Sequence, residues 1–147
     1  MEIQIIKLEK SRLNEILAIE KSSFKEPWKS DFFEKEIGLP FSHFYVALAG
    51  PKVIGYAGFW EMGEQADIIN LAVHPDFRKK GIGKKILRFI FSRAEDLGIK
   101  KVFLEVRNAN AAAQKLYSSC GFKTVGKRKK YYRDDDALIM EKEINGA

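Results

Sequence analysis

The chain has 147 residues, of which 46% are hydrophobic, and it carries a formal net charge of +6 at pH 7. This composition excludes a disordered or fibrous protein, and no apolar run approaches the roughly 18–20 residues of a membrane span. The length fits a single domain spanning residues 1–147. A lone cysteine excludes an internal disulfide, and with no signal-peptide pattern it predicts a cytoplasmic location.

The first half of the chain predicts a strand, two helices and a hairpin. Residues 3–8 alternate between apolar and polar as a strand does. Ser11 is placed to cap a first helix, and Ser30 to cap a second, short one. Two apolar runs then follow, residues 44–49 and 53–61, and the turn between them contains Gly50 and Pro51.

The second half alternates strands and helices before it ends in two strands. Residues 66–73 form an apolar, β-branched run, and residues 82–97 carry a helical apolar stripe that ends before Gly98. A short buried strand and a further helix come next, and the last two runs predict an antiparallel pair. These elements cover residues 102–106, 111–120, 122–130 and 136–144.

The order of the elements predicts the fold class. It reads β-α-α-β-β-β-α-β-α-β-β, which combines an antiparallel first half with a crossover through the long helix. We therefore expect an α+β or mixed α/β fold in which helices pack on a central sheet.

A basic, glycine-punctuated loop joins the strand that ends at Val73 to the long helix. A P-loop would need a glycine at Arg78 and a Ser or Thr at Lys85, and a dinucleotide fingerprint would need a glycine at Ile86. What remains is a helix N-terminus with free N–H groups, suited to a diphosphate. An ordinary basic surface turn fits this loop equally well.

Several motifs in order resemble those of the GCN5-related N-acetyltransferase (GNAT) superfamily. The strand and loop from Asn70 to Lys84 are similar to its motif A, and the end of the chain is similar to the subgroup that acetylates ribosomal-protein N-terminal alanine. The segments that carry the likeness are Leu104–Arg107, Asn110–Ala113, Leu116–Tyr117, Gly121–Phe122, Tyr131–Tyr132 and Asp136–Met140, with an early Pro27–Trp28.

This resemblance implies a cofactor and a fold. Acetyl-CoA would lie between two splayed parallel strands of a mostly antiparallel sheet flanked by about four helices, and no metal would be needed. Backbone groups of the first strand would hold the pantetheine arm, and the following loop would hold the diphosphate. The implied cofactor-binding residues are Leu71, Ala72, Val73, Arg78, Lys79, Lys80, Gly81, Ile82, Gly83, Lys84 and Asn110.

Glu105 and Tyr117 are the candidate catalytic residues. Taken alone, Glu105 fits a carboxylate paired with Arg107 or Lys101, and Tyr117 fits a tyrosine of the core. The resemblance implies instead that Glu105 is the general base for the acceptor amine and Tyr117 the general acid for the departing thiolate.

The acceptor is less well determined than the donor. We expect a protein N-terminal α-amine, for example the alanine of a small-subunit ribosomal protein. A broad archaeal-type N-terminal acetyltransferase and a lysine or small-amine acetyltransferase are the alternatives. A binding module for CoA or RNA without catalysis is the rival from another class, although direct nucleic-acid binding is not expected. The oligomeric state is left open.

Other reactive side chains are assigned structural roles. Cys120 lies on an apolar helix face without a neighbouring histidine, so we expect packing rather than nucleophilic catalysis. His43 and His74 are isolated, which argues against a metal site. Trp28 fits the core or the border of a peptide channel. The basic run 127–133 precedes three aspartates and predicts a solvated hairpin.

Overall fold

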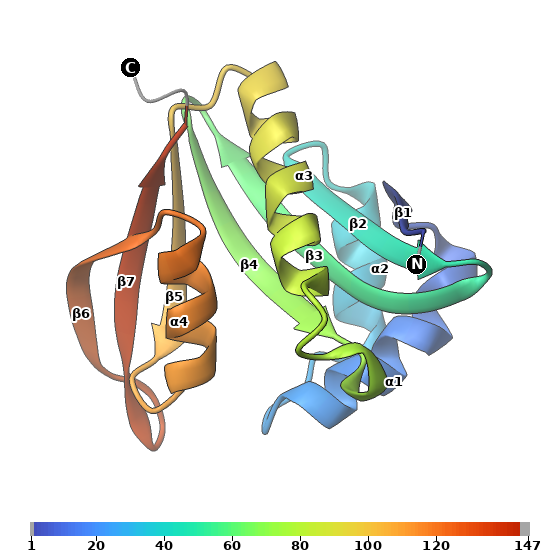
Figure 1. Cartoon of the computed structure of the whole chain (residues 1–147), viewed down its shortest axis with the longest axis horizontal. Helices are drawn as coiled ribbons and strands as arrows, with labels where there is room; N and C mark the ends of the chain where they lie inside the picture. Colours follow the sequence, from blue (N-terminus) through green and yellow to red (C-terminus); the bar gives the residue numbers. More distant parts are fainter. Residues whose placement is uncertain (1, 145–147) are drawn as a thin grey trace.

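The computed structural model describes residues 2–144, which form one seven-stranded sheet with helices on both faces (Figure 1). The strands are β1 (Gln4–Lys7), β2 (Ser42–Ala49), β3 (Lys52–Met62), β4 (Gln65–Val73), β5 (Lys101–Arg107), β6 (Lys123–Tyr132) and β7 (Asp135–Glu143). The helices are α1 (Leu13–Ser23), α2 (Ser30–Gly38), α3 (Ile82–Asp96) and α4 (Ala111–Ser119). Short 3₁₀ turns cover Lys10–Arg12 and Pro75–Phe77.

The sheet is antiparallel except at its centre. Its strand order is β1-β2-β3-β4-β5-β7-β6, and only β4 and β5 run parallel. That crossover passes through α3, as expected for parallel neighbours. The architecture confirms the predicted mixed fold and the predicted C-terminal antiparallel pair.

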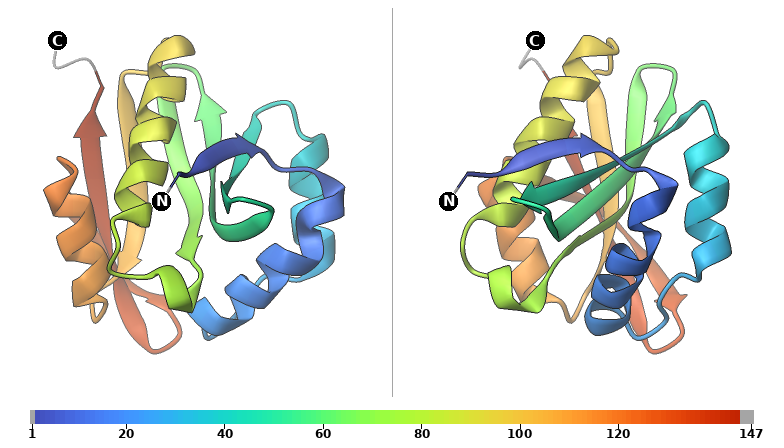
Figure 2. Two further views of the ribbon diagram at one scale, coloured as in Figure 1. Left: turned by 45° about the vertical axis from the view of Figure 1, so that its right-hand side comes forward. Right: turned by 90° about the vertical axis from the view of Figure 1, so that its right-hand side faces the viewer.

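Two cores lie on opposite faces of the sheet. Helices α3 and α4 cover one face, and α1 and α2 cover the other, as the turned views in Figure 2 show. Ile86, Leu87 and Ile90 of α3 are fully buried in the first core, which is where the predicted apolar stripe belongs. Phe33 and Tyr56 lie at the centre of the second core.

The predicted helix caps were partly wrong. Ser11 lies inside the 3₁₀ turn, Ser30 is already the first residue of α2, and neither helix has a side-chain cap. Backbone bonds take that place, because the N–H of Phe32 donates to the carbonyl of Lys29. After the C-terminal end of α3, Gly98 has the predicted left-handed conformation, with φ of 76°.

A buried carboxylate that the sequence analysis did not identify ties α1 to the sheet. Glu20 is 1% exposed. It accepts hydrogen bonds from the hydroxyl of Tyr56, from the side-chain amide of Asn70 at 3.0 Å and from the backbone N–H of Trp28 at 2.8 Å. Burial, followed by the charge of Glu20, raises the pKa of Tyr56. This network holds the segment that connects α1 to α2.

We expect Glu20→Ala to destabilise the fold by about 3 kcal/mol or more, because three donors, of which Tyr56 and Asn70 are buried, would lose their acceptor. Urea unfolding measures this as a lower midpoint. The exposed Glu26→Ala is the matched control and should leave the midpoint within error. Equal midpoints for the two variants would contradict a structural role for Glu20.

Candidate active site

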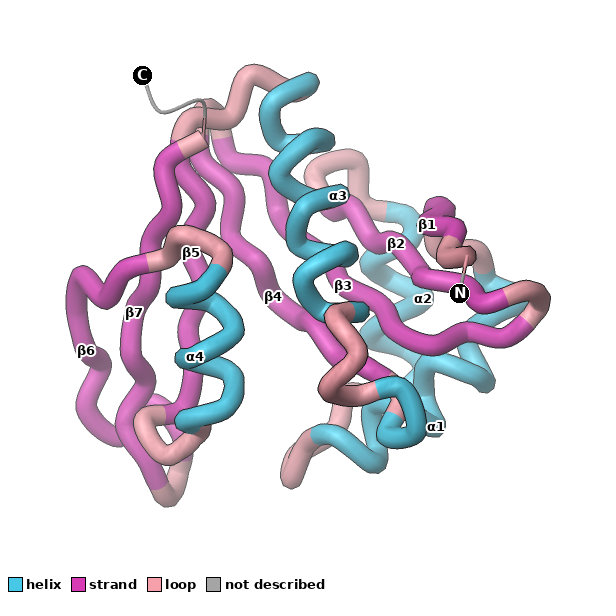
Figure 3. The backbone as a smooth tube through the Cα atoms, viewed as in Figure 1, coloured by secondary structure: helices cyan, strands magenta, loops and turns pink. Residues whose placement is uncertain are grey.

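The central strands separate and leave part of the edge of β4 unpaired. The register of β4 with β5 runs only from Gln65 and Lys101 to Ile68 and Leu104. Beyond that point the strands diverge, and the tube view shows the gap widening toward the ends of β4 and β5 (Figure 3). A bulge in β4 at residue 69, opposite the step from Gly58 to Phe59, accompanies the divergence.

The residues predicted to hold the pantetheine arm lie along this divergent segment. Leu71, Ala72 and Val73 remain paired with β3 on their other edge. Arg78 turns back toward them, because its Nε donates to the carbonyl of Val73 at 3.0 Å and its Nη2 to the hydroxyl of Ser23 at 3.0 Å. The side chain of Arg78 therefore braces the strand end against α1.

The basic loop that follows presents free backbone N–H groups. Within residues 2–144, the first intrahelical bond of α3 runs from Lys85 to the carbonyl of Gly81, and no acceptor is found for the amides of residues 81–84. Lys79 and Gly81 both have left-handed backbones, with φ of 61° and 79°, which turn the chain into the helix. The geometry suits an anion at the N-terminus of α3.

Two of the loop residues also have packing roles. Ile82 is buried in the core of the α3 face. A Cβ at Gly83 would lie 3.1 Å from Leu116 of α4. This glycine therefore permits the close approach of α3 and α4, whereas Gly81 is needed for its backbone conformation.

Glu105 directly follows Leu104, the last residue of β5 that pairs with β4, and its carboxylate is only partly paired. Its side chain is 27% exposed, and Oε1 lies 3.4 Å from Nε of Arg128. Oε2 is buried and has no hydrogen-bond partner among the described residues. The alternative interpretation of Glu105, a carboxylate paired with Arg107 or Lys101, was wrong, because Lys101 pairs with Glu141 and Arg107 with Asp134.

An irregularity in β6 brings two further side chains to Glu105. The register with β7 shifts between Arg128 and Tyr132, and Lys130 has a φ of 51°. Regular alternation would place Arg128 and Tyr131 on opposite faces. Here the Arg128 guanidinium lies 5.6 Å from the centre of the Tyr131 ring. Partial burial and the charge of Glu105 raise the pKa of Tyr131.

Tyr117 lies on α4 in a nearly dry environment. It is 9% exposed, and its ring packs edge-on against Phe122 at 5.8 Å. Burial, with smaller contributions from Tyr132 and Cys120, raises the pKa of Tyr117 to about 12. The pKa of Tyr132 is itself raised by burial and then by the charge of Glu105. Tyr132 therefore interacts electrostatically with both candidate catalytic residues.

A carboxylate bridges the two arms of the sheet at the open end. Asp134, in the β6–β7 turn, accepts hydrogen bonds from Lys25 at 2.7 Å and from Arg107 at 2.5 Å. These bonds hold the pKa of Asp134 well below its usual range. Arg107 also lies over the ring of Tyr132, 4.2 Å from its centre. The bridge joins the α1–α2 connection to the side of the sheet that carries Glu105.

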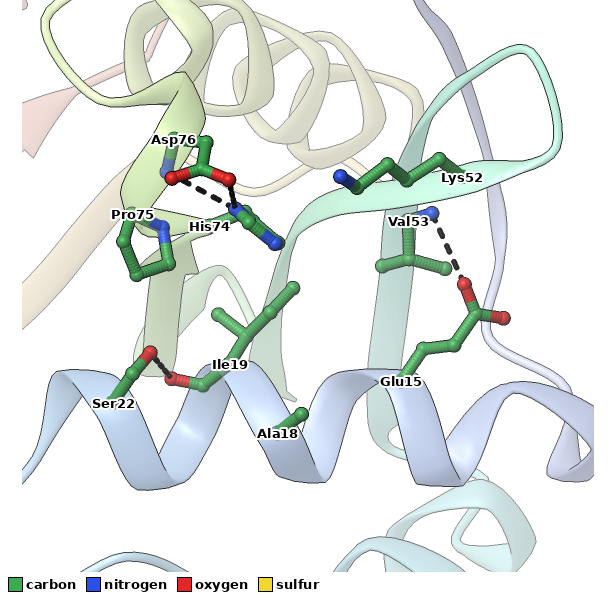
Figure 4. A pocket seen from close by; sticks show the side chains of 9 residues that line it. All are labelled: Glu15, Ala18, Ile19, Ser22, Lys52, Val53, His74, Pro75 and Asp76. Atoms are coloured by element: carbon green, nitrogen blue, oxygen red, sulfur yellow. Dashed lines mark hydrogen bonds and ion pairs between the residues drawn. The ribbon is translucent and has the colours of Figure 1, made fainter.

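The remaining candidates have local structural roles. Asn110 caps α4, because its side chain accepts from the N–H of Ala113 at 3.1 Å. His43 pairs with Glu61 at 2.9 Å. His74 accepts from the N–H of Asp76 beside a groove of about 370 Å³ between α1 and β3 (Figure 4). No three metal-ligating side chains gather among residues 2–144.

Arg128, Tyr131 and Tyr132 were not singled out as site residues from sequence. They belong to a basic, aromatic run that is typical of a solvated hairpin, and only the irregular register turns two of them toward Glu105.

In the described part of the chain, no helix is long and apolar enough to cross a membrane.

Comparisons with known proteins identify the family of the chain and several similar proteins. A model of the acetyltransferase (GNAT) family matches residues 13–122. A putative ribosomal protein bS18-alanine N-acetyltransferase of Bacillus subtilis is 35% identical over 90% of each chain, and the N-alpha-acetyltransferase RimI of Mycobacterium tuberculosis is 36% identical over 80% of this chain and 77% of its own. The crystal structure of the Escherichia coli ribosomal-protein-S18-alanine N-acetyltransferase has a TM-score of 0.91 at 30% identity, covering 99% of this chain and 96% of that one.

Proposed function

Because the chain belongs to the acetyltransferase (GNAT) family, we propose that it transfers acetyl from acetyl-CoA to the N-terminal alanine of ribosomal protein bS18. The observation that carries the proposal is Oε2 of Glu105, a buried carboxylate oxygen without a partner among the described residues, at the point where β4 and β5 separate. An unpartnered buried acceptor of this kind is costly unless it has a task.

Glu105 acts as the general base. Arg128 holds Oε1 and leaves Oε2 to accept a proton from the ammonium group of the acceptor. Arginine remains charged throughout, so it orients the carboxylate without competing for that proton. The acceptor amine becomes neutral and therefore nucleophilic.

Tyr117 acts as the general acid. Its raised pKa of about 12 keeps the hydroxyl protonated at physiological pH. It can therefore donate a proton to the thiolate sulfur of the leaving CoA. The nearly buried position of the side chain favours this protonated form.

The residues present fit acetyl-CoA as the donor. The free amides of residues 81–84, with Lys79, Lys80 and Lys84 beside them, suit its diphosphate. The divergent edge of β4 at residues 71–73 suits the amides of the pantetheine arm. When bound, acetyl-CoA supplies the activated acetyl group and a thiolate leaving group.

Two arguments favour an N-terminal amine as acceptor. An α-amino group with a pKa of about 7.7–8.0 is roughly 10–15% neutral at pH 7, whereas a lysine with a pKa of about 10.4 is below 0.1% neutral. A single carboxylate base therefore deprotonates an N-terminal amine more easily than a lysine side chain. The names of the two relatives and of the solved structure all specify N-terminal or alanine acetylation.

Mass spectrometry tests the proposal directly. The enzyme is incubated with acetyl-CoA and peptides that differ only in their first residue, including one that begins with the alanine of bS18. We expect one acetyl group on the α-amine, transferred fastest to the alanine peptide. Matched peptides with a blocked N-terminus and an internal lysine serve as the control, and modification of these alone would refute the proposal.

A further inference from the structure

The edge strand β6 carries a cluster of exposed cations. It is the last strand of the sheet, so β7 pairs with one of its edges, and in the described part of the chain the other edge has no partner strand (Figure 1). Arg133, which directly follows the strand, extends the cluster. Its members, all exposed, are Lys123, Lys127, Arg128, Lys129, Lys130 and Arg133.

Three aspartates follow this cluster and would neutralise it if they paired with it, but they are engaged largely with other groups. Asp134 pairs with cations of the α1–α2 connection and of β5. Asp135 accepts hydrogen bonds from two backbone N–H groups. Asp136 lies 3.7 Å from the ammonium group of Lys127 and accepts from the backbone N–H of Lys130 at 2.8 Å. Within the described residues, Lys127 is therefore the one member of the cluster that forms an ion pair with these aspartates.

Most of the cluster has no acidic partner. Arg128 is paired with Glu105 at 3.4 Å. The chain as a whole carries a formal net charge of +6, so the rest of the surface does not compensate for this local charge. An anionic partner would relieve the repulsion among the unpaired cations. Among residues 2–144, those that form no ion pair are Lys123, Lys129, Lys130 and Arg133.

A bulge in β6 moves part of the cluster out of the regular ladder. Between two paired positions, β6 has three residues, Lys129–Tyr131, where β7 has only Asp136. The hydrogen bond of Lys130 to Asp136 and a left-handed backbone at Lys130, with φ of 51°, accompany the bulge. A second irregularity lies between Thr124 and Gly126. An irregular, cationic edge is a poor template for a further strand, so it disfavours pairing with a peptide strand or with β6 of a second copy.

Tyr131 places an exposed aromatic ring among these cations. The residue is 54% exposed. The guanidinium of Arg128 lies 5.6 Å from the centre of the ring, and Tyr132 packs edge-on against it at 5.1 Å. These contacts hold the ring in place and leave much of it open to solvent. A nucleic-acid base can stack on such a ring whatever its sequence.

We propose that the β6 edge binds a single-stranded nucleic acid. The unpaired cations contact its phosphates, and Tyr131 stacks on a base. A duplex keeps its base faces inside the stack, and an acidic peptide offers charge without a base, so each would use only part of this surface. Direct nucleic-acid binding was not expected from the sequence, which does not show where the three aspartates pair.

Fluorescence anisotropy measures this binding in the absence of acetyl-CoA. The probe is a labelled, mixed-sequence single strand of about 12 nucleotides, prepared as RNA and as DNA. The test variant is Lys129→Gln/Arg133→Gln, which leaves the hydrogen bond of the bulge and the aromatic ring in place. Lys21→Gln/Lys35→Gln removes the same charge from exposed positions on α1 and α2 and is the matched control.

We expect both strands to bind the wild type and the control, and to bind the test variant about tenfold more weakly. The slope of log affinity against log salt concentration should become shallower by about 1.4, because each phosphate contact of a single strand contributes about 0.7. Lys129→Gln alone should change the slope by about 0.7, and it replaces the double variant if that one fails to fold.

Equal affinities of the test variant and the control would overturn the proposal, because the net charge of the protein would then explain the binding. A polyglutamate peptide of equal charge that binds as tightly as the single strand would overturn it in favour of an acidic protein partner. Equally tight binding of the duplex would exclude the stacking role of Tyr131 and overturn it as well. Acetyl transfer to the alanine peptide is measured separately, so failure of this surface and failure of the proposed function are distinguishable.

Discussion

Glu105→Gln should lower kcat about 1000-fold while the KM for acetyl-CoA stays within about twofold, because general base catalysis contributes roughly 10²- to 10⁴-fold. The substitution keeps the size of the side chain and its contact with Arg128 but removes the basic oxygen. Initial rates with the alanine peptide, measured from pH 6 to pH 9, test this expectation.

The matched control for this variant is Glu141→Gln. Glu141 lies on β7, opposite Phe103 of β5, and is engaged with Lys101. It should retain full kcat. High pH should partly restore the kcat of Glu105→Gln, because the α-amine of the acceptor peptide is then already neutral without a base. Equal kcat values for Glu105→Gln and the wild type across the whole pH range would show that Glu105 is not the base.

Tyr117→Phe should slow the chemical step about 100-fold, the lower end of the range for general acid catalysis. A thiolate is a better leaving group than an alkoxide, so protonation assists it less. The ring and its contact with Phe122 are kept, and the melting temperature should change little. Single-turnover rates are the appropriate measurement, because product release can mask a slower chemical step in kcat.

The raised pKa of Tyr117 determines how activity and stability should depend on pH. Its folded-state pKa of about 12 exceeds the ordinary value of 10. The hydroxyl therefore stays protonated below pH 10, and Tyr117 adds no alkaline limb to the activity profile there. Its contribution to stability is complete below pH 10 and is lost as the pH rises through 12. Unchanged single-turnover rates in Tyr117→Phe would contradict the acid role.

Local patterns were sufficient for most of the secondary structure. The stripe of α3 and the β-branched run of β4 each have one strong period, so they predicted elements within one or two residues. Gly50 and Gly98 marked turns that do adopt left-handed backbones. Helix starts were less predictable, because 3₁₀ backbone bonds replaced the expected serine caps at α1 and α2.

Side-chain partners were less predictable than elements. One interpretation of Glu105 paired it with a cation of its own strand, yet its partner Arg128 comes from β6. Lys101 and Arg107 do share a strand face with Glu105, but each of them pairs with an acidic residue from another part of the chain. The partner of Glu105 on β6 depends on the irregular register of that strand. A shift of one residue would bring a different side chain to Glu105.

The sequence by itself determined the alternation of strands and helices and the glycine-rich turn into α3, because each depends on residues close together in the chain, whereas the candidate donor site was implied by the family resemblance. Only the tertiary structure decided that β4 and β5 separate after Ile68 and that Oε2 of Glu105 is left without a partner among the described residues. These depend on contacts between residues far apart in sequence, which local patterns do not encode.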